Sequence, residues 1–181
     1  MKNIGSLALR KEIAREMSWA ELLEEKSRRW PERVILVYED RELTYRDMDE
    51  NANKTANLLV DLGGCRGTGA AIFMGNSPQF LYAFAGTQKI GMYSIPVNTS
   101  LRGSSLRFIL HHSDAEFLFI DGEYLDRYTA IADQLPNIKK VIVNRPSGSS
   151  GALPRGMIDL ARADSRSTAR PAGSYGPHDI C

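Results

Sequence analysis

The sequence predicts an α/β fold: a mainly parallel sheet flanked by helices, with a small amino-terminal hairpin and an irregular carboxy-terminal tail. From residue 70 to residue 143, short apolar segments alternate with segments of helical periodicity. This alternation is typical of βαβ units, because parallel strands require a crossover connection between them. The chain has 181 residues, of which 43% are hydrophobic, so it can bury one substantial core.

The first helix and the hairpin are predicted from local signals. Ser18 and Glu21 have the spacing of a capping box. Pro31 ends the helix that they begin, because the residue before a proline avoids helical geometry. The apolar run 34–38 and the short segment 42–44 then flank a charged turn, which predicts a β-hairpin.

The next helix is expected to begin after Thr44, a good N-cap residue with Asp47 three positions further on. It is expected to end at the glycine pair 63–64. Between these limits, apolar and small residues recur at the spacing of one helix face: Tyr45, Met48, Ala52, Thr55, Ala56, Leu59 and Leu62.

Beyond the glycine pair, strands and helices are expected to alternate. Ser77 is a typical cap, and Pro78 suits the first position of the helix that follows it. Gly91 separates this helix from the next strand, and Ser104 is the expected cap of the next helix. The expected strands are 70–74, 92–97, 116–120 and 139–143, and the expected helices are 78–89, 104–112 and 124–134.

The composition changes after residue 144. The segments 146–151 and 165–177 are rich in Ser, Gly and Pro, as flexible linkers are. Within this region only Met157–Ala161 is expected to form a short helix. The sequence therefore divides into an amino-terminal extension (1–16), an α/β subdomain (17–144) and a linker-like tail (145–181).

Charge and composition argue against several classes of partner. The formal net charge is +1, so no global field would attract nucleic acid or an anionic membrane. Cys65 and Cys181 do not have a metal-binding spacing. No apolar run has the length of a signal peptide or of a membrane span. We expect a cytoplasmic protein whose contact with membranes, if any, is peripheral.

Two glycine-containing turns are candidates for binding phosphate. A phosphate loop follows a strand and opens a helix, so that free amides face the anion. The glycines between residues 63 and 69 follow a helix and precede a strand, which favours a plain connecting loop. The turn at Gly75 and Asn76 has the correct polarity, but a tight turn capped by Ser77 is the favoured interpretation, with an anion site as the alternative.

The histidines and a cluster of aromatic residues are more typical of structure than of chemistry. His111 and His112 are adjacent in a helix and point in different directions, so they cannot share one metal ion well. Phe80, Tyr82 and Phe84 are typical of helix packing, with a wall of an acyl pocket as the alternative.

Charged residues are expected to lie in solvent. Those of the helix after Thr44 are expected to form its solvated face, and the arginines of the tail are expected to keep a linker soluble. The acidic residues are Asp47, Asp49, Glu50 and Asp61, and the arginines are Arg155, Arg162, Arg166 and Arg170. The residues alone therefore indicate no catalytic, cofactor-binding or metal-binding site.

A series of segments carries a resemblance to a known family. In chain order these are Leu43–Leu59, Ala71–Phe80, Lys89–Met92, Ile95–Gly103 and Ser113–Ala115. Together they resemble the amino-terminal part of the adenylate-forming, or AMP-binding, acyl-CoA synthetase superfamily. The similarity is greatest to its long-chain and very-long-chain fatty acid branch, which includes fatty acid transport proteins. The resemblance covers about residues 17–144.

The resemblance implies an activity for a complete enzyme. A fatty acid would react with ATP to give acyl-AMP and pyrophosphate, and CoA would then accept the acyl group, with Mg²⁺ as a further cofactor. In the family, a segment like Pro177–Cys181 leads into the phosphate loop, and the Mg²⁺-binding Glu and the catalytic Lys lie further on. We therefore expect this chain to be a catalytically inactive fragment that binds ATP, CoA and Mg²⁺ weakly at most.

The resemblance also implies partners. The expected partner is the remainder of the synthetase chain, the expected substrate of the complete enzyme is a fatty acid, and no nucleic acid is expected. A homodimer is compatible with the sequence. One alternative is a free-standing, non-catalytic α/β module that binds a partner or a nucleotide. Another, a flavodoxin-like or dinucleotide-binding domain, is disfavoured because no glycine fingerprint follows the first strand.

Overall fold

A five-stranded sheet forms the centre of the computed structural model, which describes residues 17–146, 149 and 151–172. The strand order is β4-β3-β5-β6-β7, and every neighbouring pair is parallel. The strands are β3 (Gly69–Phe73), β4 (Tyr93–Pro96), β5 (Ala115–Asp121), β6 (Lys140–Asn144) and β7 (Met157–Asp159). This confirms the predicted α/β class with a parallel sheet.

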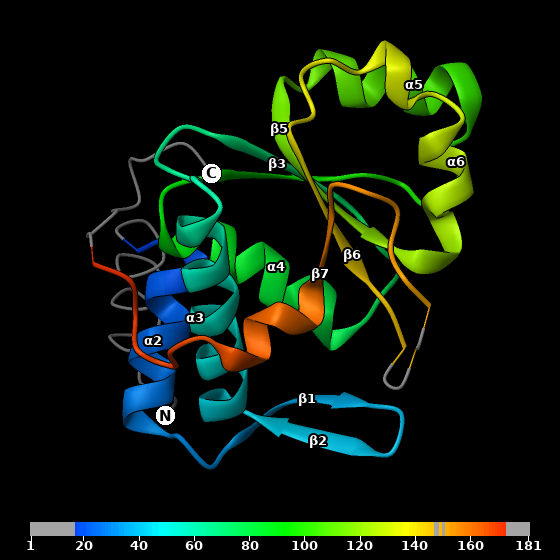
Figure 1. Cartoon of the computed structure of the whole chain (residues 1–181). Coiled ribbons are helices and arrows are strands. Elements are labelled where there is room, and N and C mark those ends of the chain that lie inside the picture. Colours follow the sequence, from blue (N-terminus) through cyan, green and yellow to red (C-terminus); the bar gives the residue numbers. More distant parts are fainter. Residues whose placement is uncertain (1–16, 147–148, 150, 173–181) are drawn as a thin grey trace, which may run out of the picture.

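Helices cover both faces of the sheet (Figure 1). The longer helices are α2 (Trp19–Arg29), α3 (Tyr45–Asp61), α4 (Pro78–Lys89) and α5 (Gly103–His112). Shorter ones are α6 (Leu125–Thr129) and the 3-10 helices η1 (Gly122–Tyr124), η2 (Ala132–Gln134) and η3 (Leu160–Ser165). Among the described residues, every helix is too short or too polar to cross a lipid bilayer.

Two cores form because side chains of each central strand alternate between the faces of the sheet. In β3, Ala70 and Ile72 point into a core shared with α3 and α4. Ala71 and Phe73 point into a second core, which is shared with α5 and α6. A strand that is buried on both faces must be apolar throughout, which explains the uninterrupted apolar run at this position.

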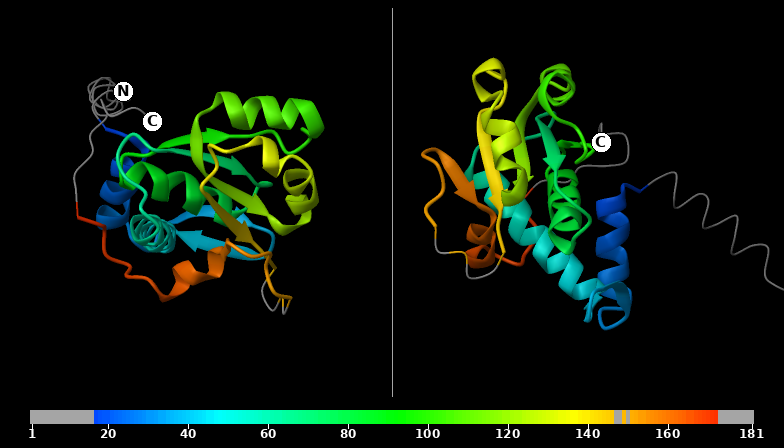
Figure 2. Two further views of the ribbon diagram at one scale, coloured as in Figure 1. Left: turned by 45° about the horizontal axis from the view of Figure 1, so that its top comes forward. Right: turned by 90° about the vertical axis from the view of Figure 1, so that its right-hand side faces the viewer.

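The amino-terminal hairpin lies outside the main sheet. Strands β1 (Val34–Tyr38) and β2 (Arg41–Thr44) pair antiparallel, as the sequence predicts. A third, smaller core joins α2 to α3 and α4 through Leu23, Met48 and Ala85, and Figure 2 shows α2 packed beside these helices.

Three predicted helix caps, Ser18, Thr44 and Ser77, are confirmed. The Ser18 hydroxyl accepts a hydrogen bond from the Glu21 backbone N–H at 3.2 Å, and the Glu21 carboxylate accepts one from the Ser18 backbone N–H, which completes the capping box. Thr44 and Asp47 form the same arrangement at the start of α3. These hydrogen bonds satisfy backbone N–H groups that have no partner inside the helix.

Several details differ from the prediction. Helix α5 begins at Gly103, and its N-cap residue is Arg102, which makes no capping hydrogen bond through its side chain. Ser104 therefore lies inside the helix. The helix expected over 124–134 is divided into the short elements η1, α6 and η2.

The expected short helix at Met157–Ala161 is wrong. Residues Met157–Asp159 form β7, which extends the sheet by pairing with β6, and η3 follows directly. Strand β7 supplies backbone partners for the edge of β6, and Ile158, Leu160 and Ala163 bury their side chains in the core next to α3. Because this pairing depends on a distant strand, the local sequence gives little sign of it.

Candidate functional site at the carboxyl edge of the sheet

The chain reverses its direction across the sheet next to β3. From β3 it passes to β4 on one side, and it then returns to β5 on the other side. In parallel sheets, such a switch point leaves a crevice outside the carboxyl ends of the two strands, and ligands commonly bind there. A ligand site is therefore expected at the carboxyl ends of β3 and β5.

A cleft of about 530 Å³ lies at this position. It is lined by the turn after β3 (75–79), the turn after β5 (121–123), the end of β6 (144–146) and the β1–β2 turn. Its charged residues are Glu39, Arg41, Asp121, Glu123 and Arg145. The cleft thus lies between the hairpin and the main sheet, and it contains side chains of both positive and negative charge.

Asp121 connects the ends of the three central strands. Its Oδ2 accepts a hydrogen bond from the Gly75 backbone N–H at 2.7 Å, after β3. Its Oδ1 accepts one from Asn144 Nδ2 at 2.7 Å, at the end of β6. Both carboxylate oxygens are therefore engaged in holding the turns together. Ser77 is also engaged, because its Oγ accepts a hydrogen bond from the Phe80 backbone N–H at 3.2 Å.

Arg145 is held at the rim of the cleft by the tail. Its Nε donates a hydrogen bond to Asp159 Oδ2 at 3.0 Å, and its Nη2 forms an ion pair with the same oxygen. A further N–H of its guanidinium donates to the carbonyl oxygen of Gly151. Burial raises the pKa of Asp159, but hydrogen bonds from Arg145 and from the Ala161 backbone N–H outweigh this and leave the pKa below its ordinary value.

The cleft contains neither a cluster of metal ligands nor a lysine among its described residues. Within the part of the chain that the structure describes, no group of three or more His, Cys, Asp or Glu side chains could hold a metal ion. The turn at Gly75 has no lysine among the residues that line the cleft, and its capping serine already has a partner. The favoured interpretation of this turn, a tight turn with a helix cap, agrees with the geometry.

The other residues considered from the sequence lie away from the cleft. His111 and His112 are both exposed in the last turn of α5, where the ring of His112 stacks on Phe108 with 5.4 Å between centroids. Phe80 and Phe84 stack on each other and pack against the core of α3 and α4. Gly63 and Gly67 adopt positive φ angles in a helix-to-strand loop, as the order of elements predicts.

Asp121, Asn144 and Arg145 were not singled out from the sequence. A signal for them exists, because Asp121 and Asn144 each end an apolar strand of a parallel sheet. Polar residues at such positions meet at one edge of the sheet, even when they are distant in the chain.

Replacing Asp121 by alanine is expected to lower the free energy of unfolding by about 1.5–3 kcal/mol, the range for hydrogen bonds to a charged group. The variant leaves the Gly75 N–H and the Asn144 amide without their common acceptor. Urea unfolding of Asp121→Ala and wild type measures the change. Glu123→Ala, which removes an exposed carboxylate from the same cleft, should change stability by less than about 0.5 kcal/mol. Equal losses of stability in Asp121→Ala and Glu123→Ala would contradict the role of Asp121 in holding the turns together.

Comparison with known proteins identifies the family. The profile of the family described as AMP-binding enzyme matches residues 23–173. The chain belongs to the AMP-binding enzyme family. The suspected resemblance to adenylate-forming acyl-CoA synthetases is therefore confirmed, and the match includes β7 and η3.

Relatives within the AMP-binding family are ligases that form CoA esters of different acids. A medium/long-chain-fatty-acid–CoA/3-oxocholest-4-en-26-oate–CoA ligase of Mycobacterium marinum is 31% identical over 113 residues, which are 62% of this chain and 20% of the relative. A 4-hydroxybutyrate–CoA ligase 2 of Metallosphaera sedula is 26% identical over 157 residues, 87% of this chain and 27% of the relative. The chain thus spans about a quarter or less of the length of such relatives.

Solved structures of the family have the same fold. The amino-terminal domain of FACL13 from Mycobacterium tuberculosis superposes with a TM-score of 0.75 at 26% identity, over 90% of this chain and 39% of that one. The anthranilate CoA ligase AuaEII superposes with a TM-score of 0.80 at 24% identity, over 90% of this chain and 30% of that one. At this identity, the second comparison supports the fold alone.

Proposed function

We propose that this chain is the amino-terminal part of a fatty acid–CoA ligase, which joins a fatty acid to CoA through an acyl-AMP intermediate. The family match over residues 23–173 carries the proposal, together with the small share of each ligase that the chain covers. A fatty acid substrate is supported by the name of the Mycobacterium marinum ligase. Other relatives are ligases for hydroxybenzoate and crotonobetaine/carnitine, so the test includes aromatic and hydroxylated acids beside fatty acids.

We further propose that residues 1–181 contribute no side chain to the chemistry. Asp121, Ser77 and Arg145 are all engaged in fixing turns. ATP, CoA and Mg²⁺ would therefore bind to the remainder of the enzyme. Residues 17–144, together with β7 and η3, would serve as the subdomain against which that remainder packs. Because the proposed reaction uses ATP and CoA, we place the protein in the cytoplasm.

The test compares two proteins. The first is the 181-residue chain, and the second is the product of the same gene with any coding sequence downstream of Cys181. Each is incubated with ATP, Mg²⁺ and one carboxylic acid, either hexadecanoate, octanoate, 4-hydroxybenzoate or 4-hydroxybutyrate, and ATP–pyrophosphate exchange is measured. We expect exchange only for the longer protein and mainly with the two fatty acids.

Each other outcome overturns one part of the proposal. Acyl-AMP formation by the 181-residue chain would show that it contains catalytic groups. Exchange by the longer protein with only the aromatic or hydroxylated acid would refute the fatty acid substrate. A stop codon directly after Cys181 would favour the free-standing, non-catalytic module.

A further inference from the structure

The segment 166–170, here called the strap, crosses the outer surface of α3 toward α2. It follows η3, and Figure 1 shows it running beside both helices. The residues Ser167, Thr168, Ala169 and Arg170 are all exposed. Because it contributes no large buried apolar side chain, the strap depends on polar contacts for its position.

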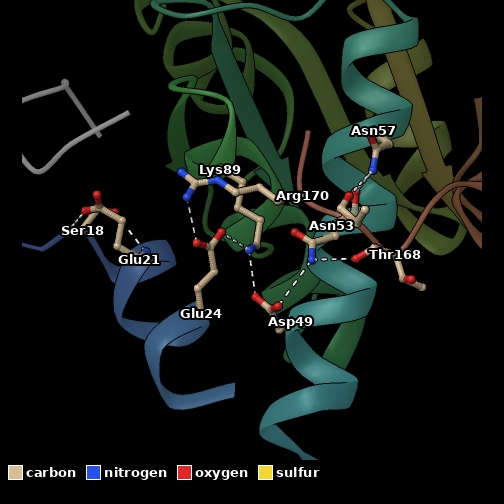
Figure 3. A network of polar contacts seen from close by, with 10 residues as sticks. Ser18, Glu21, Glu24, Asp49, Asn53, Asn57, Lys89, Thr168 and Arg170 are labelled. Atoms are coloured by element: carbon tan, nitrogen blue, oxygen red, sulfur yellow. Dashed lines mark hydrogen bonds and ion pairs between the residues drawn. The ribbon is translucent and has the colours of Figure 1, made fainter. Parts of the chain in front are cut away.

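Two asparagines of α3 hold the main chain of the strap (Figure 3). Asn57 Nδ2 donates hydrogen bonds to the carbonyl oxygens of Ser167 at 3.0 Å and Ala169 at 2.9 Å. Asn53 Nδ2 donates to the carbonyl oxygen of Thr168 at 2.8 Å. Residues four positions apart lie on one face of a helix, so these two amides together contact three successive peptide groups.

Charged residues hold the two ends of the strap. Arg170 Nη1 forms an ion pair with Glu24 Oε2 of α2 at 2.8 Å, and Arg166 Nε forms one with Asp61 Oδ2 of α3 at 2.8 Å. These two arginines and Asp61 are thus not merely solvated, contrary to the expectation from sequence. Glu24 also contacts the fully buried Lys89 at 2.7 Å through its other oxygen. One carboxylate is therefore shared between the interior and the strap.

Each contact of the strap is weak on its own. The Asn57 hydrogen bonds are exposed to solvent, and Arg170 is partly exposed. Exposed ion pairs contribute about 0–1 kcal/mol each, because water and salt screen them. The position of the strap therefore depends on the sum of several weak polar contacts.

We propose that the strap is a releasable clasp, which opens as a unit while the body of the fold stays intact. Regions with few buried apolar contacts have the lowest free energies of local opening, and the strap is such a region. The body beneath it has its own contacts: the core that joins α3 and α4, and the buried Lys89, which contacts Asp49 of α3 as well as Glu24. Opening frees the Asn53 and Asn57 amides from the strap and leaves Glu24 Oε2 without its arginine partner. The clasp is independent of the proposed ligase activity.

The rate of cleavage by trypsin reports the opening of the strap. The Arg166–Ser167 bond is a cleavage site that the closed strap protects, whereas Arg170 is followed by Pro171 and resists cleavage. The Arg155–Gly156 bond lies in an exposed loop outside the strap and serves as an internal reference. When opening is fast relative to cleavage, the cleavage rate follows the open fraction. In the wild type we expect slower cleavage after Arg166 than after Arg155.

Two variants and one control test whether the ion pair of Arg170 and the hydrogen bonds of Asn57 hold the strap in place. Arg170→Gln should raise cleavage after Arg166 about two- to fivefold, the range for a partly exposed ion pair. Asn57→Ala should raise it about tenfold, since two hydrogen bonds are lost. Asn51→Ala changes an asparagine of the same helix whose Nδ2 donates to the Asp47 carbonyl oxygen and whose Oδ1 lies 3.5 Å from Lys54 Nζ, both within α3, and it should leave the rate unchanged. Cleavage after Arg155 should not change in any of them.

Two results would overturn the proposal. An unchanged rate after Arg166 in both Arg170→Gln and Asn57→Ala would show that these contacts do not hold the strap. A parallel rise in cleavage after Arg155 and Arg166 would show that the whole fold opens instead of the strap. Thermal unfolding of each variant, followed by circular dichroism, verifies that it is folded at the assay temperature.

Discussion

Replacing Lys89 by methionine is expected to lower the free energy of unfolding by about 3–5 kcal/mol, the typical cost of removing one partner from a buried ion pair. The Lys89 side chain is completely buried at the end of α4. Its Nζ contacts Glu24 Oε1 of α2 at 2.7 Å and Asp49 Oδ1 of α3 at 2.8 Å, as Figure 3 shows. Methionine fills a similar volume, so the loss comes from the carboxylates of Glu24 and Asp49, each only 16% exposed, which lose the Lys89 ammonium.

The structure provides a matched control for Lys89→Met. Lys139 also forms an ion pair at 2.7 Å, with Glu116, but the two side chains are 61% and 40% exposed. Exposed pairs contribute about 0–1 kcal/mol because water and salt screen them. Urea unfolding of Lys139→Met should therefore show a change below about 1 kcal/mol. Similar losses for the two variants would refute the argument from burial.

A triple variant tests whether carboxylates left without the Lys89 ammonium cause the loss of stability. Lys89→Met combined with Glu24→Gln and Asp49→Asn leaves no buried charge without a partner. Replacing every member of a buried ion cluster is much less costly than removing one member. The triple variant should therefore be more stable than Lys89→Met alone. If it is less stable, hydrogen bonding by these side chains, rather than charge compensation, dominates the cluster.

The ion cluster of Lys89, Glu24 and Asp49 shows what local sequence patterns cannot predict. The pattern correctly places Lys89 at the end of a helix, but its partners lie 65 and 40 positions earlier in the chain. Asp49 was expected on a solvated helix face, yet it pairs with Lys89. Helical periodicity shows which residues share a face, and it does not show which faces meet in the fold.

Predictions of secondary structure succeeded where the signal is contained in a few neighbouring residues. The capping residues Ser18, Thr44 and Ser77 and the apolar strand β3 are of this kind. The prediction failed at strand β7, because this strand is short and forms by pairing with β6. The cleft was missed for the same reason, since its residues come from the ends of separate strands. Family resemblance supplied the proposed reaction, which none of these residues reveals.

Replacing Gly86 by leucine is expected to lower the free energy of unfolding by about 3 kcal/mol or more, because extra atoms in a close-packed interface force the structure apart. Gly86 lies in α4 where this helix crosses α3. A Cβ atom added at Gly86 would lie 3.0 Å from the Ala52 carbonyl oxygen, 3.0 Å from Thr55 Cβ and 3.1 Å from the Ala56 backbone nitrogen. Most of these atoms belong to the backbone of α3, which cannot move without displacing the whole helix.

Two substitutions of increasing size, Gly86→Ala and Gly86→Leu, separate the effect of crowding on stability from the effect of helix propensity. Alanine has a helix propensity about 1 kcal/mol better than that of glycine, and its single methyl group requires shifts of only a few tenths of an ångström. Gly86→Ala should therefore change stability little, while Gly86→Leu is strongly destabilising. Ser105→Leu places the same side chain on the exposed surface of α5 and should change stability by about 0.5 kcal/mol or less. Because α3 and α4 together cover one face of the sheet, tolerance of leucine at Gly86 would mean that the two helices do not pack as closely as the fold requires.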